Sequence, residues 1–205
     1  MQEELIRMEH IDKTFPGVKA LNDASFQLLS GEVHALVGEN GAGKSTLMKV
    51  LTGVNRKDKG EIYVQGEEVQ INDIRDSQKL GIVMIHQELN LMNHLTVAQN
   101  IFIGREATDK SGIFLNDREI EKKSLEIFKK LNLNINPSEK VGRLTVAKQQ
   151  MVEIAKALSY DSKVLIMDEP TASLTDSEIA DLFRVIRMLR DEGKGIIHIS
   201  HRLEE

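Results

Sequence analysis

The chain has 205 residues, 40% of them hydrophobic, which is enough for one substantial core with a smaller subdomain. It contains no cysteine, which excludes disulfides and thiolate metal sites, and its formal net charge of −5 disfavours a broad nucleic-acid-binding face. No apolar run approaches the roughly 18 to 20 residues that cross a bilayer, and the N-terminus MQEELIRMEH is too acidic for a secretion signal, so we expect a cytosolic protein.

The N-terminal residues predict two strands joined by a turn. Ile6, Met8 and His10 alternate with other residues, which predicts that they share one side of the first strand. Phe15-Pro16-Gly17 favours a turn, and residues 24–28 alternate again. Phe15 could stack on a nucleotide base, as aromatic side chains do elsewhere, but packing in the core fits the sequence at least as well.

Residues 33–51 predict a short apolar strand, a glycine-rich loop and a helix. The strand is VHALV, and the helix carries one apolar stripe, made of Leu47, Met48, Val50 and Leu51. Between them, the pattern G-x-x-x-x-G-K-S of a phosphate-binding loop is completed by Gly38, Gly43, Lys44 and Ser45. An ordinary glycine-rich turn is the alternative, but a Lys-Ser pair between a strand and a helix disfavours it.

The residue types of this loop suit a polyphosphate. Several backbone N–H groups can converge on one phosphate only where Cβ atoms are absent, as at Gly38, Gly41 and Gly43. The following helix adds the positive end of its dipole. Lys44 can reach the β and γ phosphates, and the Ser45 hydroxyl is placed to ligate Mg²⁺. The predicted nucleotide phosphate site consists of Gly38, Glu39, Asn40, Gly41, Ala42, Gly43, Lys44, Ser45 and Thr46.

Residues 60–87 predict a hairpin, a short helix and a buried strand. The hairpin pairs EIYVQ with EVQI around Gly66-Glu67, and Asn72 and Asp73 can cap a helix that ends by Gly81. An apolar strand over residues 82–86 then stops at Gln87. Gln87 is a candidate functional residue, because α/β proteins place their chemistry at the ends of buried strands.

Residues 88–143 change character and are interpreted as a helical insertion. A short helix is expected near residues 96–102, and a longer one begins at Asn116, with Glu119 at capping-box spacing. The longer helix is amphipathic, and its predicted apolar face carries Ile120, Leu125, Phe128 and Leu131. Another helix follows over residues 144–158, with Thr145 as its expected N-cap.

The segment KVLIMDEP predicts a strand that ends at two adjacent carboxylates, Asp168 and Glu169. An acidic residue at such a position can hold Mg²⁺ through water, and its neighbour can orient or deprotonate an attacking water. The alternative is a strand-to-loop junction with solvated acids, which the preceding phosphate loop disfavours.

The last predicted elements are a helix and a strand. Thr175 and Glu178 have capping-box spacing at the start of the helix, and Gly193 ends it. The strand GIIHIS then leads to His201, a further polar residue at a strand end. A structural role is the interpretation for the remaining histidines, which are His10, His34, His86, His94 and His198.

In their order and spacing, these motifs resemble the ATP-binding cassette ATPases of ABC transporters over nearly the whole chain. The residues that carry the resemblance are GENGAGKS, Gln87, LTVAKQQ, IMDEPT and Ser200-His201. The resemblance implies an α/β P-loop NTPase fold with a mainly parallel core sheet, an N-terminal antiparallel β region and a helical subdomain. It implies one domain, with its core at residues 1–87 and 160–205 and the helical subdomain at about 88–159.

The resemblance also implies roles for single residues. ATP and Mg²⁺ are the expected cofactors, and Phe15 is expected to stack on adenine. Glu169 is the expected catalytic carboxylate, Gln87 contacts Mg²⁺ and the attacking water, and His201 contacts the γ-phosphate. The expected metal site consists of Ser45, Gln87 and Asp168.

Two departures from the family pattern stand out. The usual signature Leu-Ser-Gly-Gly-Gln is here replaced by Leu144, Thr145, Val146, Ala147 and Lys148. In the family this segment contacts the ATP of a partner cassette, and side chains at Val146 and Ala147 should obstruct that approach, although Thr145 keeps a hydroxyl. The family also usually has Ser-Ala-Leu-Asp after the acidic pair, whereas residues 172–175 of this chain are Ala-Ser-Leu-Thr. These changes predict an asymmetric motor. The ATP site of this chain would be completed by a partner's better signature, whereas the partner's ATP would face the weak signature of this chain.

Segments such as IHQELNLMNHLTVAQNIFIGRE are similar to the N-terminal cassette of ribose, galactose and xylose importers, which carry two fused cassettes. Expected partners are a second cassette, transmembrane permease subunits and, indirectly, a periplasmic or extracellular sugar-binding protein, with no nucleic acid. The resemblance places the chain peripherally at the cytoplasmic face of the membrane. Because the chain stops just past His201, we expect it to be C-terminally truncated.

Two alternatives stay open at this point. One is a soluble cassette ATPase that acts on ribosomes or DNA, and the other is a nucleotide-binding regulatory cassette without turnover, suggested by the altered signature. A GTPase is disfavoured because the chain lacks an Asn-Lys-x-Asp base-reading motif.

Overall fold

A computed structural model describes residues 3–39, 41–105 and 116–200 of the chain. Internal contacts divide the chain into two compact units. Unit 1 consists of Met1–Gln87, Ser162–Pro170 and Ile186–Glu205, and unit 2 of Glu88–Asp161 and Thr171–Val185. Asn40 and His201, both assigned to the nucleotide site, lie outside the described residues.

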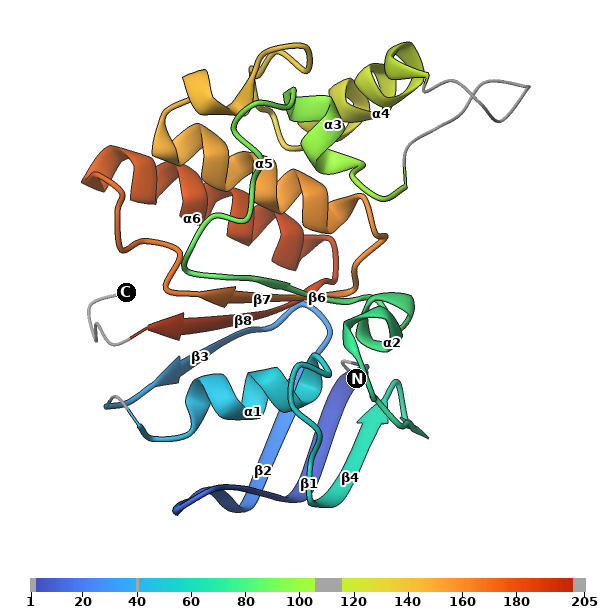
Figure 1. Cartoon of the computed structure of the whole chain (residues 1–205), viewed down its shortest axis with the longest axis vertical. Coiled ribbons are helices and arrows are strands. Elements are labelled where there is room, and N and C mark those ends of the chain that lie inside the picture. Colours follow the sequence, from blue (N-terminus) through green and yellow to red (C-terminus); the bar gives the residue numbers. More distant parts are fainter. Residues whose placement is uncertain (1–2, 40, 106–115, 201–205) are drawn as a thin grey trace. The chain divides into compact units, whose positions relative to one another are not determined.

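Unit 1 contains an antiparallel sheet at its N-terminal end (Figure 1). The strand order is β2-β1-β4-β5, with β1 at Glu4–Phe15, β2 at Val18–Leu29, β4 at Lys59–Val64 and β5 at Glu67–Glu68. A tight turn joins β1 to β2, since Phe15 pairs with Val18 and Gly17 between them has a φ of 82°. The second predicted hairpin is β4-β5, where Val64 pairs with Glu67.

A second sheet in unit 1 is parallel throughout its described strands. Its order is β3-β8-β7-β6, with β3 at Val33–Val37, β8 at Gly195–Ser200, β7 at Val164–Asp168 and β6 at Ile82–Ile85. Parallel strands end at one edge, so the residues after β3, β6 and β7 and the last residue of β8 are brought to the same edge of the sheet. The prediction of an α/β fold with a parallel core sheet and an N-terminal antiparallel region is confirmed.

Helix α1 (Lys44–Leu51) packs between the two sheets of unit 1 (Figure 1). Its predicted apolar stripe is buried and belongs to one core cluster with Met8 of β1 and with Ile166 and Ile197 of the parallel sheet. Burial of each such side chain contributes about 1.5–3 kcal/mol to folding. Helix α2 (Ile74–Lys79) begins at the predicted cap, because the Asp73 carboxylate accepts hydrogen bonds from the backbone N–H groups of Arg75 and Asp76.

Unit 2 is helical. It contains α3 (Val97–Ile101), α4 (Asp117–Lys130), the 3₁₀ turn η1 (Val141–Arg143), α5 (Val146–Leu158) and the first part of α6 (Asp176–Asp191). Thr96 and Gln99 form a capping box on α3, and the Thr145 hydroxyl accepts a hydrogen bond from the Lys148 N–H at the start of α5. None of the helices in the described ranges is long and apolar enough to span a membrane.

The buried face of α4 differs from the predicted one. Leu125, predicted to be buried, is 53% exposed, whereas Ser124 is buried and donates a hydrogen bond to the Ile120 carbonyl. Ile120, Ser124 and Phe128 are spaced four residues apart and therefore lie on one face of the helix. The small serine takes the core position because its hydroxyl is satisfied by the helix backbone.

The prediction that His10 shares a side with Ile6 and Met8 is also wrong. Ile6 and Met8 are fully buried, but His10 is exposed and has a φ of 53°. The pairing register shifts between Met8 and Ile11, which marks a bulge that restores Ile11 to the core. Gly60 lies against this bulge, where a Cβ atom would be 2.4 Å from the Glu9 carbonyl oxygen.

The bulge gives a testable pH dependence of stability. His10 Nδ1 lies 2.6 Å from Asp23 Oδ1, and the hydrogen bond and charge of Asp23 raise the pKa of His10 above its ordinary 6.5. The ion pair therefore stabilises the fold below the unfolded-state pKa, and this contribution is lost as the pH rises through the folded-state pKa. Asp23→Asn should lower the thermal unfolding midpoint more at about pH 5.5 than at about pH 9. Equal losses at the two pH values would contradict this assignment.

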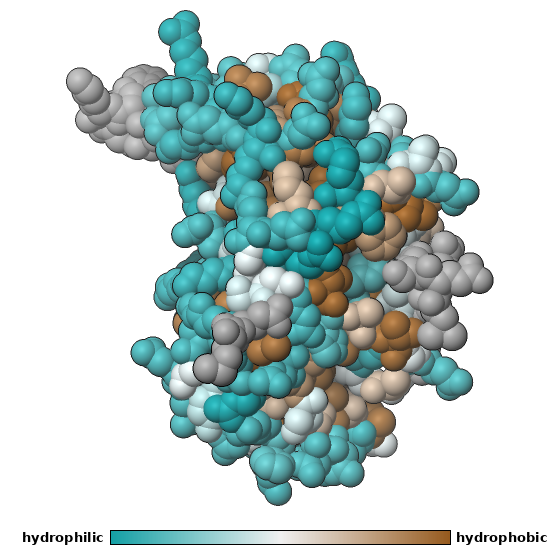
Figure 2. Space-filling view, turned by 180° about the vertical axis from the view of Figure 1, so that it is seen from behind, coloured by the Kyte–Doolittle hydropathy of each residue, from teal (hydrophilic) through white to brown (hydrophobic). Residues whose placement is uncertain are grey.

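Figure 2 shows hydrophilic side chains over most of one face of the molecule, with hydrophobic side chains in smaller groups between them.

Candidate functional site

The loop between β3 and α1 has the backbone that a phosphate-binding loop requires. Gly43 has a φ of 89° and forms the N-cap of α1, where a Cβ atom would lie 2.9 Å from the Ala20 carbonyl oxygen. Gly41 has a φ of 85° with open space around it. Gly43 provides no capping side chain and the first turn of α1 has no acidic residue, so neither satisfies the N–H groups nor neutralises the positive dipole end of this helix. This arrangement suits an anion.

The Lys44 side chain folds over the same loop. Its ammonium donates hydrogen bonds to the carbonyl oxygens of Gly38 at 2.6 Å and Glu39 at 3.0 Å. The Ala42 N–H donates to the Glu39 carbonyl at 3.2 Å and tightens the turn. A cation is therefore held beside the uncapped helix end, where it adds charge-assisted hydrogen bonding for a negatively charged group.

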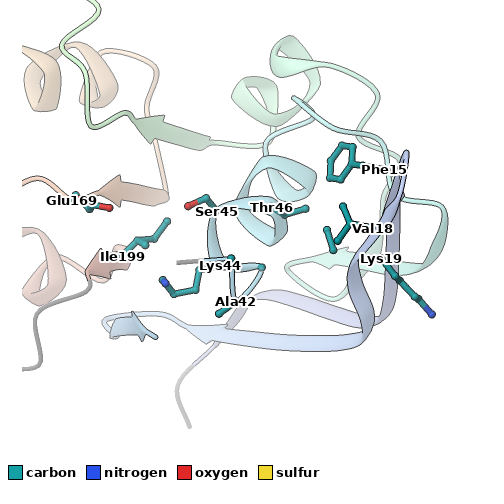
Figure 3. Close-up of a pocket in the computed structure, with 12 residues that line it drawn as sticks. Phe15, Val18, Lys19, Ala42, Lys44, Ser45, Thr46, Glu169 and Ile199 are labelled. Atoms are coloured by element: carbon teal, nitrogen blue, oxygen red, sulfur yellow. The ribbon is translucent and has the colours of Figure 1, made fainter. Parts of the chain in front are cut away.

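A cavity of about 350 Å³ opens over this loop, entirely within unit 1 (Figure 3). Its lining residues are Phe15, Val18, Lys19, Ala20, Gly41, Ala42, Gly43, Lys44, Ser45, Thr46, Glu169 and Ile199. Most of the residues predicted for nucleotide binding thus share one cavity. Gly38 and Glu39 are not among the lining residues, and they contact the cavity through Lys44.

Glu169 follows β7 in an unusual backbone conformation. Its φ is 47°, and its N–H donates a hydrogen bond to the Ile199 carbonyl at 3.0 Å. Non-glycine residues in the left-handed region are strained and cluster at functional sites. Figure 3 shows the side chains of Glu169 and Ser45 directed toward one another across the cavity. The half-buried Glu169 carboxylate is therefore placed to act on a group bound at the end of α1.

Gln87 and Asp168 lie at the same edge of the sheet as Glu169. Gln87 follows β6, and its Nε2 donates a hydrogen bond to Glu169 Oε2 at 3.1 Å. Asp168 is the last residue of β7 and pairs in register with Ile199 of β8. Neither side chain lines the cavity itself. The amide of Gln87 fixes the direction of the Glu169 carboxylate.

The predicted signature segment lies in unit 2 and is described by itself. Leu144 is buried, and Val146 is 46% exposed. The Gln149 side-chain amide donates hydrogen bonds to the carbonyl oxygens of Val141 at 3.3 Å and Leu144 at 3.1 Å, which anchors the segment to η1. The Val146 side chain therefore projects from the start of α5 where the family pattern has glycine.

Four lining residues were not predicted from the sequence. Val18, Lys19 and Ala20 follow the turn after Phe15, so the short Pro-Gly connection was the signal that could have placed them beside it. Ile199 is brought to the cavity by the parallel register of β7 and β8. The pairing of Asp168 with Ile199 joins residues about 30 positions apart, so no short stretch of the sequence could predict it.

Comparisons with known proteins agree with this geometry. The family model described as ABC transporter matches residues 21–172. A protein of Burkholderia cenocepacia (strain HI2424) is 60% identical over 99% of this chain, and it is named as a ribose/galactose/methyl galactoside import ATP-binding protein. An Albidiferax ferrireducens protein with the same kind of name is 56% identical over 98%. The chain spans only 40% of the length of each of these relatives.

Solved structures give the same result. A nucleotide-free ATP-binding cassette from an ABC transporter superposes with a TM-score of 0.86 at 29% identity, over 98% of this chain and 83% of that one. An ATP-binding cassette in its ADP conformation superposes with a TM-score of 0.86 at 30% identity, over 98% and 82%. A dimeric bacterial cassette reaches 0.79 at 25% identity, over 98% and 89%.

Proposed function

The chain belongs to the ABC transporter family, and we propose that it is the part of an importer that binds and hydrolyses ATP to drive uptake of a monosaccharide. One observation carries the proposal. Lys44, the uncapped N-terminus of α1 and Glu169 converge on a single cavity that also contains the aromatic ring of Phe15. Such a site offers a phosphate cradle, a carboxylate and a surface for a base.

The cavity fits ATP by its residue types. The backbone of Gly41–Thr46 and the Lys44 ammonium suit the triphosphate, and the half-buried ring of Phe15 suits the adenine. Asn40, Gly38 and Glu39 belong to the proposed phosphate site as well. Lys44 would exchange its hydrogen bonds to the carbonyl oxygens of Gly38 and Glu39 for bonds to phosphate oxygens. This exchange keeps the ammonium satisfied with and without nucleotide.

Glu169 is the proposed general base. Its carboxylate would take the proton of the water that attacks the γ-phosphate, and Gln87 holds the carboxylate through the 3.1 Å hydrogen bond. Mg²⁺, held by Ser45, Asp168 and Gln87, would neutralise negative charge on the phosphates. His201 completes the proposed site, although it lies outside the described residues. Within this chain, the proposal therefore assigns proton transfer to Glu169 and its orientation to Gln87.

The proposed partners follow from the relatives and from the altered signature. A second cassette, fused or separate, would complete the nucleotide site, as the solved dimeric cassette supports. Permease subunits would bind the chain peripherally at the cytoplasmic face of the membrane, and a periplasmic or extracellular protein would deliver the sugar. The exposed Val146 would weaken this chain's contact with the partner's ATP, so the two sites of the assembly would be unequal.

Hydrolysis of Mg²⁺-ATP, measured over a range of chain concentrations, tests this proposal. We expect saturable ATP binding, and activity that rises faster than linearly with concentration because each site needs a second copy. Binding without hydrolysis at every concentration would mean that Val146 and Ala147 prevent a homodimer from working and that a different cassette is required. Absence of ATP binding would overturn the proposal.

A further inference from the structure

The ring of Phe15 is contacted by a charged residue of its own strand. Phe15 is the last residue of β1 and is half-buried, next to the exposed turn residues 16–17. The ammonium of Lys13 lies 5.4 Å from the centre of the Phe15 ring, within the range of a cation–π contact. Only 14% of the Lys13 side chain is exposed, so this ammonium is well fixed. The position of the ring therefore depends on what holds Lys13.

Asp58, from the segment that precedes β4, holds both residues before Phe15. Its Oδ1 accepts a hydrogen bond from the Lys13 ammonium at 2.8 Å, and its Oδ2 accepts one from the Thr14 N–H at 2.7 Å. The Asp58 N–H donates to the Asp12 carbonyl at 2.9 Å. The ion pair with Lys13, followed by the Thr14 hydrogen bond, lowers the pKa of Asp58 below its ordinary value, so the carboxylate is charged at neutral pH.

We propose that Asp58 is a positioning residue for nucleotide-base recognition, acting through Lys13 and Thr14 to fix the Phe15 ring at the cavity wall. Neither Asp58 nor Lys13 lines the cavity, so the effect is indirect. The inference rests on the proposed function, because it requires Phe15 to contact the base. It makes the base contact depend on the segment after α1, more than 40 residues from Phe15 in the chain.

The physical reason is preorganisation. An aromatic ring at the end of a strand, beside a Pro-Gly turn, has to be ordered when a base stacks on it, and ordering a side chain on binding lowers affinity about 2- to 12-fold. The two hydrogen bonds to Asp58 make this ordering a property of the free protein. The phosphate loop has its own supports and does not contact Asp58 in the described structure. Loss of the two hydrogen bonds to Asp58 should therefore weaken binding of the base and leave binding of the phosphates unchanged.

Asp58→Asn tests the proposal in the 205-residue chain, with equilibrium binding of ATP and of inorganic tripolyphosphate as the two readouts. We expect affinity for ATP to fall about 2- to 12-fold and affinity for tripolyphosphate, which has no base, to stay unchanged. Lys13→Met should give the same base-selective loss. In a Phe15→Ala background, Asp58→Asn should cause no further loss, since the ring it positions is absent. The control is Asp23→Asn, which removes the exposed ion pair between His10 and Asp23 in the β1-β2 hairpin.

The outcomes separate this inference from the proposed function. Weaker ATP binding by Phe15→Ala together with unchanged binding by Asp58→Asn and Lys13→Met would overturn the positioning role of Asp58 and leave the proposed function intact. Equal losses for ATP and tripolyphosphate would also overturn it, because they would indicate a general loosening of the site. Unchanged ATP binding by Phe15→Ala would remove the base site on which both depend.

Discussion

Glu169→Gln should lower the rate of ATP hydrolysis by about 10²- to 10⁴-fold, the range that a positioned general base contributes. The amide has nearly the same shape as the carboxylate and can still bond to Gln87, but it cannot accept a proton from water. ATP affinity should change little, because the phosphate loop and the Phe15 ring are untouched. The measurement is steady-state hydrolysis in the assembled transporter, with ATP binding measured on the same preparation.

A matched control is Glu68→Gln, which makes the same chemical change on the exposed strand β5. It should leave both hydrolysis and binding unchanged. Near-normal hydrolysis by Glu169→Gln would remove Glu169 from the proposed mechanism, even if ATP binding stayed intact. Loss of binding together with hydrolysis would mean instead that the Glu169 carboxylate, which accepts the hydrogen bond from Gln87, also supports the shape of the cavity.

Lys44→Ala should weaken ATP binding by about 10- to 100-fold, the effect of losing hydrogen bonds from a charged group. The ammonium is the cation that lies directly over the phosphate loop, at 2.6 Å from the Gly38 carbonyl oxygen. Without it, the phosphate loop keeps its backbone N–H groups and the helix dipole but has no charged side chain that can donate to the phosphates. Calorimetric titration with ATP at fixed ionic strength measures the change, because binding of a polyanion depends on salt.

Lys49→Ala is the matched control, since Lys49 lies in the last turn of the same helix α1. It removes one positive charge from the helix without touching the loop, so its effect on ATP affinity should be small. Similar losses in the two variants would show that the site responds to net charge alone. The specific role of the Lys44 side chain would then have to be abandoned.

Local features of this protein were predictable because their causes lie within a few residues. The phosphate-loop pattern placed a glycine at the start of α1, and Gly43 has the positive φ that this position demands. The caps Asp73, Asn116 and Thr145 all bond to N–H groups two or three residues ahead. Strand ends were found from apolar runs that stop at polar residues, as at Asp168.

Other features depend on contacts that the chain order does not reveal. Alternation alone placed His10 beside Met8, but the close approach of Gly60 accommodates a bulge that turns His10 to the solvent. Helical spacing placed Leu125 in the core, but packing in unit 2 selected Ser124. In both cases a neighbouring element decided between two local patterns that the sequence permits equally.

The sequence by itself determined which chemical groups this protein carries, since the phosphate loop and the acidic pair are fixed by residue type and short spacing. Only the tertiary structure decided which of them meet. The parallel register of β7 and β8 brings Ile199 and Glu169 to the loop, and Asp58 reaches the residues before Phe15 from the segment after α1. Such contacts join distant parts of the chain, and their geometry follows from sheet register and core packing, which no short stretch of residues encodes.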